Sequence, residues 1–237
     1  MSHAGIAQTW DWDDDASAGA WIEARLGTWA TVAGVMPAGY PAYVCFANAA
    51  DPQESAFGGL IGHAGLSRPD RLDQLLDLLA PITGDQRCHF ALWTGFGDLY
   101  DHGTDPMRTT SFGYLTASGP DEPAPDASEL SSREREYRYA RMIERPAAPT
   151  LELPGRAYHL WHGPLAAARA MQRADHSPTL MWPEDRSWFV GSEIDYLVTI
   201  LAGPTELADR ALADPYWAAT ATVADQSPPP SWFEQAP

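Results

Sequence analysis

Lysine is absent from this chain of 237 residues, so all 15 of its basic residues are arginine. A lysine is required for Schiff-base and pyridoxal-phosphate chemistry, for the P-loop and for the ATP site of protein kinases. Its absence therefore excludes these enzyme classes. The complete preference for arginine, with abundant Ala, Gly and Pro, is typical of a GC-rich genome.

Positive charge is scarce overall, because 32 acids against 15 arginines give a formal net charge of −17. This excess repels the phosphates of nucleic acids and the anionic surfaces of membranes. No stretch approaches the roughly 18 apolar residues of a membrane span, and residues 1–12 lack the pattern of a signal peptide. We expect a cytoplasmic protein that binds neither nucleic acid nor membrane and whose charge attracts a basic protein partner.

Cysteine is also rare, with two in the chain. Cys45 and Cys88 are far apart and each lies in an apolar stretch, which favours buried, reduced thiols. A single disulfide between them is the alternative. The signatures G-x-S-x-G, H-E-x-x-H and C-x-x-C are missing, and Tyr100 occupies the position of the third glycine of a dinucleotide-binding loop.

Helical and extended patterns alternate along the chain. Leu72, Leu75, Leu76 and Leu79 follow the i, i+3, i+4, i+7 spacing of an amphipathic helix, which Pro81 is expected to end. Further helices are expected at 16–26, 131–145, 164–172 and 207–212. Strands are expected at 32–36, 40–47, 87–93, 150–153, 157–162, 180–182, 187–194 and 218–223.

This order of elements predicts an α+β fold, with a mixed, largely antiparallel sheet and helices packed on one side. We expect residues 1–237 to form a single globular domain. Residues 117–132 are acidic and proline-rich with almost no large apolar side chain, so they are expected to be a flexible insertion. The tail at 226–237 holds four prolines and is expected to be disordered.

A Gly-rich stretch offers potential metal ligands. Asp98, Asp101, His102 and Asp105 fall within eight residues. Carboxylates and imidazole are ligands of divalent cations. The spacing matches no EF-hand, so an ordinary turn rich in Asp and Gly is the alternative. A divalent metal ion is thus the one cofactor considered, and otherwise we expect none.

Two histidines, His159 and His162, are three residues apart. On a strand such residues point to opposite faces, whereas on a helix they share one face. The neighbouring Tyr158, Leu160 and Trp161 favour a strand, so we do not expect the two imidazoles to bind one ion.

A possible acid–base site lies near residue 190. Glu193 and Asp195 share one face of the expected strand, and Arg186 in the preceding turn is available to pair with a carboxylate. Two carboxylates with an arginine suit general acid–base catalysis or the binding of a cationic ligand. The structural alternative is that Asp185 and Arg186 fix a tight hairpin packed by aromatic side chains.

Several motifs resemble those of an uncharacterised actinobacterial protein family. They are Trp93-Thr-Gly-Phe-Gly-Asp-Leu99, Pro154-Gly-Arg-Ala-Tyr-His-Leu160 and Trp182-Pro-Glu-Asp-Arg-Ser-Trp188 with Glu193-Ile-Asp195. The resemblance covers about residues 87–213 and departs from the family at 199–204, where the family has a glycine-rich segment. It implies a complete cytoplasmic protein of a widespread bacterial type, and it implies no reaction and no catalytic residue.

Three functions remain open from the sequence. The first is an acidic, non-enzymatic binding protein, such as a toxin-neutralising immunity protein. The alternative is a metal-assisted hydrolase or lyase that uses Glu193, Asp195 and Arg186, with the metal at Asp98, Asp101 and His102. The third is a scaffold whose tail docks on a partner through Trp232 and Phe233.

Overall fold

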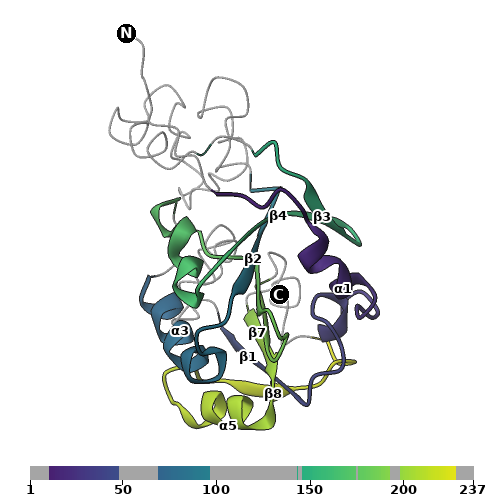
Figure 1. Ribbon diagram of the computed structural model, residues 1–237. Helices are drawn as coiled ribbons and strands as arrows, with labels where there is room; N and C mark the ends of the chain where they lie inside the picture. Colours follow the sequence, from purple (N-terminus) through teal and green to yellow (C-terminus); the bar gives the residue numbers. More distant parts are fainter. Residues whose placement is uncertain are drawn as a thin grey trace, which may run out of the picture.

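The computed structural model describes residues 11–47, 69–96, 143, 146–174, 176–192 and 198–227. Its strands form one eight-stranded sheet in the order β3-β4-β2-β5-β6-β7-β1-β8, and every pairing is antiparallel (Figure 1). The expected α+β class is therefore confirmed. The strands are β1 (Ala42–Ala47), β2 (Cys88–Trp93), β3 (Thr150–Leu153), β4 (Arg156–Gly163), β5 (Leu180–Pro183), β6 (Phe189–Ser192), β7 (Val198–Gly203) and β8 (Thr220–Thr222).

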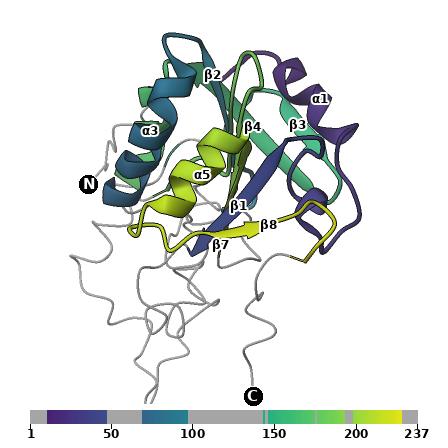
Figure 2. The same cartoon turned by 90° about the horizontal axis from the view of Figure 1, so that it is seen from below.

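The three longest helical elements pack on one face of the sheet. They are α3 (Pro69–Thr83), the 3-10 helix η7 (Leu165–Ala174) and α5 (Thr205–Ala213). The four leucines predicted to form a stripe on α3 are at most 3% exposed and pack into the core. Burial of a leucine side chain stabilises a fold by about 1.5–3 kcal/mol, so this stripe anchors α3 to the sheet. In Figure 2, α3 and α5 lie side by side.

The prediction that Pro81 ends this helix is wrong, because α3 continues to Thr83. A proline so close to the end of a helix removes only one backbone hydrogen bond. The Thr83 hydroxyl donates to the Leu79 carbonyl at 2.9 Å, and the Gly84 N–H donates to the Ala80 carbonyl at 3.0 Å. Gly84 has φ +59°, a left-handed conformation that closes the helix.

The N-terminal segment covers the opposite face through η1 (Ser17–Gly19), α1 (Ala20–Glu23) and η2 (Val32–Gly34). The helix expected at 16–26 is therefore short and partly 3-10. The strand expected at 32–36 is wrong. The Val32 carbonyl accepts hydrogen bonds from the N–H groups of Val35 and Met36, so this run forms a 3-10 turn that buries Val32 and Met36 against the sheet.

Side chains alternate between the two faces along each strand. On β2, for example, Phe90 and Leu92 join the core under α3, whereas Ala91 joins the core under the N-terminal segment. The remaining expected strands are present with shifts at their ends, and β7 is a fully buried strand that the sequence analysis did not identify.

Several expectations concern residues that lie outside the described part of the chain. These are the insertion at 117–132 and the helix at 131–145, apart from Ile143, which is buried. The tail is described only to residue 227, where the Gln226 carbonyl accepts a hydrogen bond from Val32 N–H at 2.8 Å. Within the described residues, no helix combines the length and apolar character needed to cross a bilayer.

Candidate functional site

Arg186, the predicted carboxylate clamp, lies in the turn between β5 and β6. Its backbone is left-handed, with φ 57°, and its guanidinium carbon lies 4.9 Å from the centroid of the Trp21 ring. It forms no ion pair with a described carboxylate. Glu193 and Asp195 lie outside the described residues, so their convergence with Arg186 stays a prediction.

Asp185 ties this turn to the connection between α3 and β2. Its N–H donates to Gln86 Oε1 at 3.1 Å, and Gln86 Nε2 donates back to Asp185 Oδ2 at 3.2 Å. Asp185 Oδ1 also accepts the Ser187 N–H at 2.9 Å. Burial raises the pKa of Asp185, but these hydrogen bonds outweigh that effect and lower its pKa below the ordinary value. These contacts give Asp185 a structural role in the hairpin, and the catalytic role of Glu193, Asp195 and Arg186 stays a prediction.

The predicted metal ligands Asp98, Asp101 and His102 lie outside the described residues, as does Asp105. Among the residues that the structure does describe, no group of three or more His, Cys, Asp or Glu side chains converges in a way suited to a metal ion. The metal-assisted hydrolase therefore stays a prediction from sequence.

His159 and His162 lie on opposite faces of β4, as their spacing on a strand predicts. His159 packs near Trp12, at 5.5 Å between ring centroids, on the same face as α3. His162 lies opposite His89 on β2, and its Nδ1 is 2.5 Å from Asp13 Oδ1. The Asp13 N–H also donates to the Leu160 carbonyl at 2.8 Å, which lays the N-terminal segment along β4.

A row of ring side chains crosses four neighbouring strands on the N-terminal face of the sheet. His162, His89 and Trp182 are successive cross-strand partners, and Trp182 stacks between the His89 ring and the Phe189 ring of β6, at 5.6 and 5.8 Å between centroids. Trp21 contacts Trp182 and Phe189 edge-on. Such contacts contribute about 0.5–1.5 kcal/mol per pair beyond the burial of area, so the row is chiefly a packing device.

His89 is the buried polar member of this row. Its Nε2 lies 2.8 Å from Oε2 of Glu184, and this hydrogen bond is the largest cause of the lowered pKa of Glu184. Because an ionised carboxylate only accepts hydrogen bonds, Nε2 carries the proton. The Nδ1 atom of His89 is buried and has no hydrogen-bond partner among the described residues.

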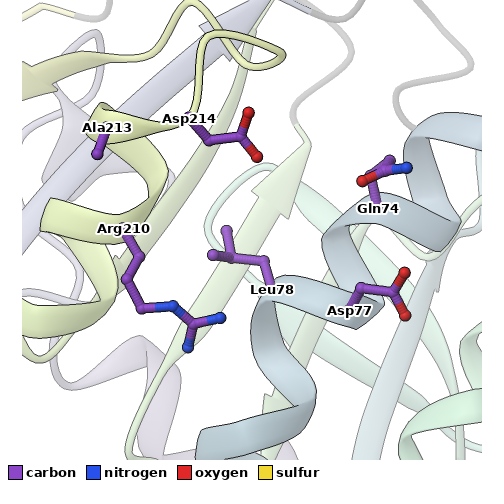
Figure 3. Close-up of a pocket in the computed structure, with 6 residues that line it drawn as sticks. All are labelled: Gln74, Asp77, Leu78, Arg210, Ala213 and Asp214. Carbon is purple, nitrogen blue, oxygen red and sulfur yellow. The ribbon is translucent and has the colours of Figure 1, made fainter.

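A second candidate region is the groove between α3 and α5. It has a volume of about 410 Å³, and residues from both helices line it (Figure 3). In the close-up, Leu78 and Gln74 of α3 face Asp214 and Arg210 across the gap. Leu78 provides the apolar floor, since it is 8% exposed and belongs to the core.

Asp77 and Asp214 line this groove together with Arg210, and α5 carries two further exposed acids. Asp77 on α3 and Glu206 and Asp209 on α5 are exposed, and Asp214 follows α5. None of these four carboxylates forms an ion pair with a described residue. Arg210 is the one arginine among the described residues that line the groove. Arg169 on η7 forms an ion pair with Asp73 of α3 at 2.7 Å.

Two apolar side chains on or after α5 are exposed without lining the groove. Leu212 on α5 is 40% exposed and Tyr216, which follows it, is 39% exposed. Arg71 of α3 holds this segment, because its guanidinium carbon lies 5.5 Å from the Tyr216 ring and 5.3 Å from the Trp217 ring. The Tyr216 N–H donates to Asp214 Oδ1 at 2.9 Å. The side chains around the groove are therefore fixed by local contacts.

The sequence analysis did not identify the residues of this groove or the partners of His89 and His162. For α3 a signal was present, since Asp70, Asp73 and Asp77 fall on the side opposite the leucines. For His89 and Glu184 there was none, because they are 95 residues apart and meet only through strand pairing.

Comparison of the chain with protein-family models, with curated proteins and with solved structures gives no match in any of the three searches.

Proposed function

We propose that the protein is a non-enzymatic binding protein that recognises a basic segment of another protein through the face formed by α3 and α5. The observation that carries the proposal is that Asp77 and Asp214 line the groove without an ion pair to any described residue, while α5 carries two further exposed acids, Glu206 and Asp209. Exposed charges of one sign attract a partner of the opposite sign and accelerate its association.

The exposed ring of Tyr216, which contacts Arg71 of α3, supports the same face. Tyrosine is enriched at the centres of protein interfaces, where burial of its ring supplies binding energy while polar residues form the rim. An acidic rim beside an apolar anchor suits a partner that presents arginine or lysine next to an apolar patch.

The narrower form of the proposal is that the partner is a toxin and that this protein neutralises it in the cytoplasm. A toxin that acts on nucleic acid needs a basic surface to hold phosphates, and an acidic protein that covers this surface competes with the substrate. Cys45 and Cys88 are free and buried, which suits a reducing compartment.

The test begins by isolating the partner from the native host at low salt and producing it in recombinant form. Its association rate is then measured for the wild type and for a variant with Asp77 and Asp214 replaced by asparagine. A matched control replaces two exposed acids elsewhere, namely Asp14→Asn and Asp225→Asn. Both variants lose the same net charge.

We expect the groove variant to lose about tenfold or more in association rate at low salt, and the control to lose much less. The difference between the variants should shrink as the salt concentration rises, because exposed charges are screened. Equal losses in the two variants would show that net charge alone matters and would refute the groove as the binding site. A partner without a basic surface would refute the proposed function itself.

A further inference from the structure

Two exposed arginines from different parts of the chain lie over the same indole ring. The guanidinium carbon of Arg25, which follows α1, is 5.4 Å from the centroid of the Trp21 ring, and that of Arg186 in the β5–β6 turn is 4.9 Å from it. The indole is itself held against the sheet by its edge-on contacts with Trp182 and Phe189. The two guanidinium carbons are therefore no farther apart than the sum of their distances to this ring.

Tyr40 gives a second indication that the two positive charges lie close together. Burial raises the pKa of Tyr40, and the guanidiniums of Arg25 and Arg186 both oppose this rise. The hydroxyl group of Tyr40 is buried and has no hydrogen-bond partner among the described residues. Both arginines thus lie near one phenol as well as near one indole.

The two acids that precede Arg186 in its turn are engaged elsewhere. The carboxylate of Asp185 accepts a hydrogen bond from Gln86, and that of Glu184 is hydrogen-bonded to His89. Neither acid forms an ion pair with Arg186. The positive charge of this arginine is therefore available to a ligand.

Contact with an aromatic ring prepares a guanidinium for binding an oxyanion. The five N–H donors lie in the plane of the guanidinium, so a ring that packs on its face leaves them free. Arginine binds phosphate oxygens through two parallel hydrogen bonds. Because the ring also restricts the side chain before the ligand arrives, less conformational entropy is lost on binding.

We propose that Arg25 and Arg186 form a binding site for the phosphate group of a small ligand. Each guanidinium would donate hydrogen bonds to the phosphate oxygens, and the two positive charges would match the two negative charges of the group. The site belongs to the face of the sheet that the N-terminal segment covers, whereas α3 and α5 pack on the other face. It is therefore independent of the proposed protein-binding face.

The experiment titrates the whole protein with inorganic phosphate and with phenyl phosphate at pH 8, where both are dianions. Calorimetry and ³¹P NMR measure binding. Comparison of these two ligands distinguishes a site for the free ion from a site for a phosphate monoester. Phenyl sulfate, which has nearly the same shape but one negative charge, is the ligand control. We expect a dissociation constant of about 1 mM or below for at least one of the phosphates and at least about fivefold weaker binding of phenyl sulfate.

Variants of the two arginines test the site itself. Arg25→Gln and Arg186→Gln should each weaken phosphate binding about three- to fivefold, and the double variant should abolish it. Arg210→Gln removes the same charge from the other face and should leave binding unchanged. Urea denaturation verifies that each variant is folded. The proposal is overturned if neither phosphate binds up to about 20 mM, if phenyl sulfate binds as tightly as phenyl phosphate, or if the double variant binds no more weakly than Arg210→Gln.

Discussion

Nε2 of His89 lies 2.8 Å from Oε2 of Glu184, so a buried imidazole on β2 is hydrogen-bonded to a carboxylate that follows β5 and is 62% exposed. The hydrogen bond lowers the pKa of Glu184 from its ordinary value of 4.5. The unfolded chain therefore binds a proton at this position more readily than the folded chain. Consequently the contact stabilises the fold at pH values above the ordinary pKa of glutamate. This stabilisation is lost as the pH falls through the lowered pKa of Glu184.

Glu184→Gln should destabilise the protein by about 0.2–1 kcal/mol at neutral pH, the range of exposed ion pairs, because glutamine accepts a hydrogen bond but carries no charge. The difference from the wild type should vanish in acid. Urea denaturation measures the free energy of unfolding of the variant and of the wild type, first at neutral pH and then at a pH below the ordinary pKa of glutamate. Glu206→Gln on α5 is the control. If the difference in stability between Glu184→Gln and the wild type persists unchanged in acid, it does not arise from the hydrogen bond between His89 and the ionised Glu184.

Thr83→Val should destabilise the protein by about 1–3 kcal/mol, the cost of leaving a buried polar group without a partner. The reason is that Trp188 Nε1 donates to the Thr83 hydroxyl at 3.0 Å, and Trp188 is 0% and Thr83 3% exposed. Chemical denaturation gives the free energy of unfolding. Thr83→Ser keeps the hydroxyl and should recover most of the loss; if serine is as destabilising as valine, packing rather than the hydrogen bond explains the effect.

Gly191→Ala should destabilise the protein by about 1–3 kcal/mol through overpacking. A Cβ atom at Gly191 would lie 2.5 Å from Met36 Sδ, and Met36 is completely buried. In the double variant Gly191→Ala/Met36→Ala the new methyl group enters space that the methionine vacates. The two effects should therefore be less than additive, by at least about 0.5 kcal/mol in a double-mutant cycle. Strict additivity would show that the two residues are not coupled.

Cys45 and Cys88 should resist thiol reagents in the folded protein. Burial raises the pKa of Cys45 to about 11 and that of Cys88 to about 12, so neither is a thiolate at neutral pH. With Ellman's reagent we expect no reaction in native buffer and two reactive thiols after denaturation. Rapid labelling of either cysteine in the folded state would contradict the burial of that thiol.

The sequence predicted elements well where a pattern repeats along the chain. The leucines of α3 repeat over about two turns, which is enough to distinguish a helix from a strand. The run at 32–36 is too short for that distinction, and it forms a 3-10 turn because local hydrogen bonds to Val32 replace pairing with a strand. For β7 the β-branched residues Val198, Thr199 and Ile200 were a usable signal that the sequence analysis did not apply.

The candidate sites were less predictable because they depend on contacts between distant parts of the chain. Asp13 reaches His162 across 149 residues only because the N-terminal segment runs along β4. The groove between α3 and α5 exists because both helices pack on the same face of the sheet. The spacing of residues along the chain predicts neither of these contacts. Asp13, His89 and Asp214 were therefore not predicted to be site residues.

The position of β1 in the sheet sets the order of events during synthesis on the ribosome. β1 pairs with β7 on one side and with β8 on the other, and these are the last two of the described strands along the chain. The loop that this pairing closes is about 150 residues long, a slow step in folding. Until then the nascent chain carries an apolar strand with two unpaired edges, so its exposure to pairing with other chains lasts for most of translation.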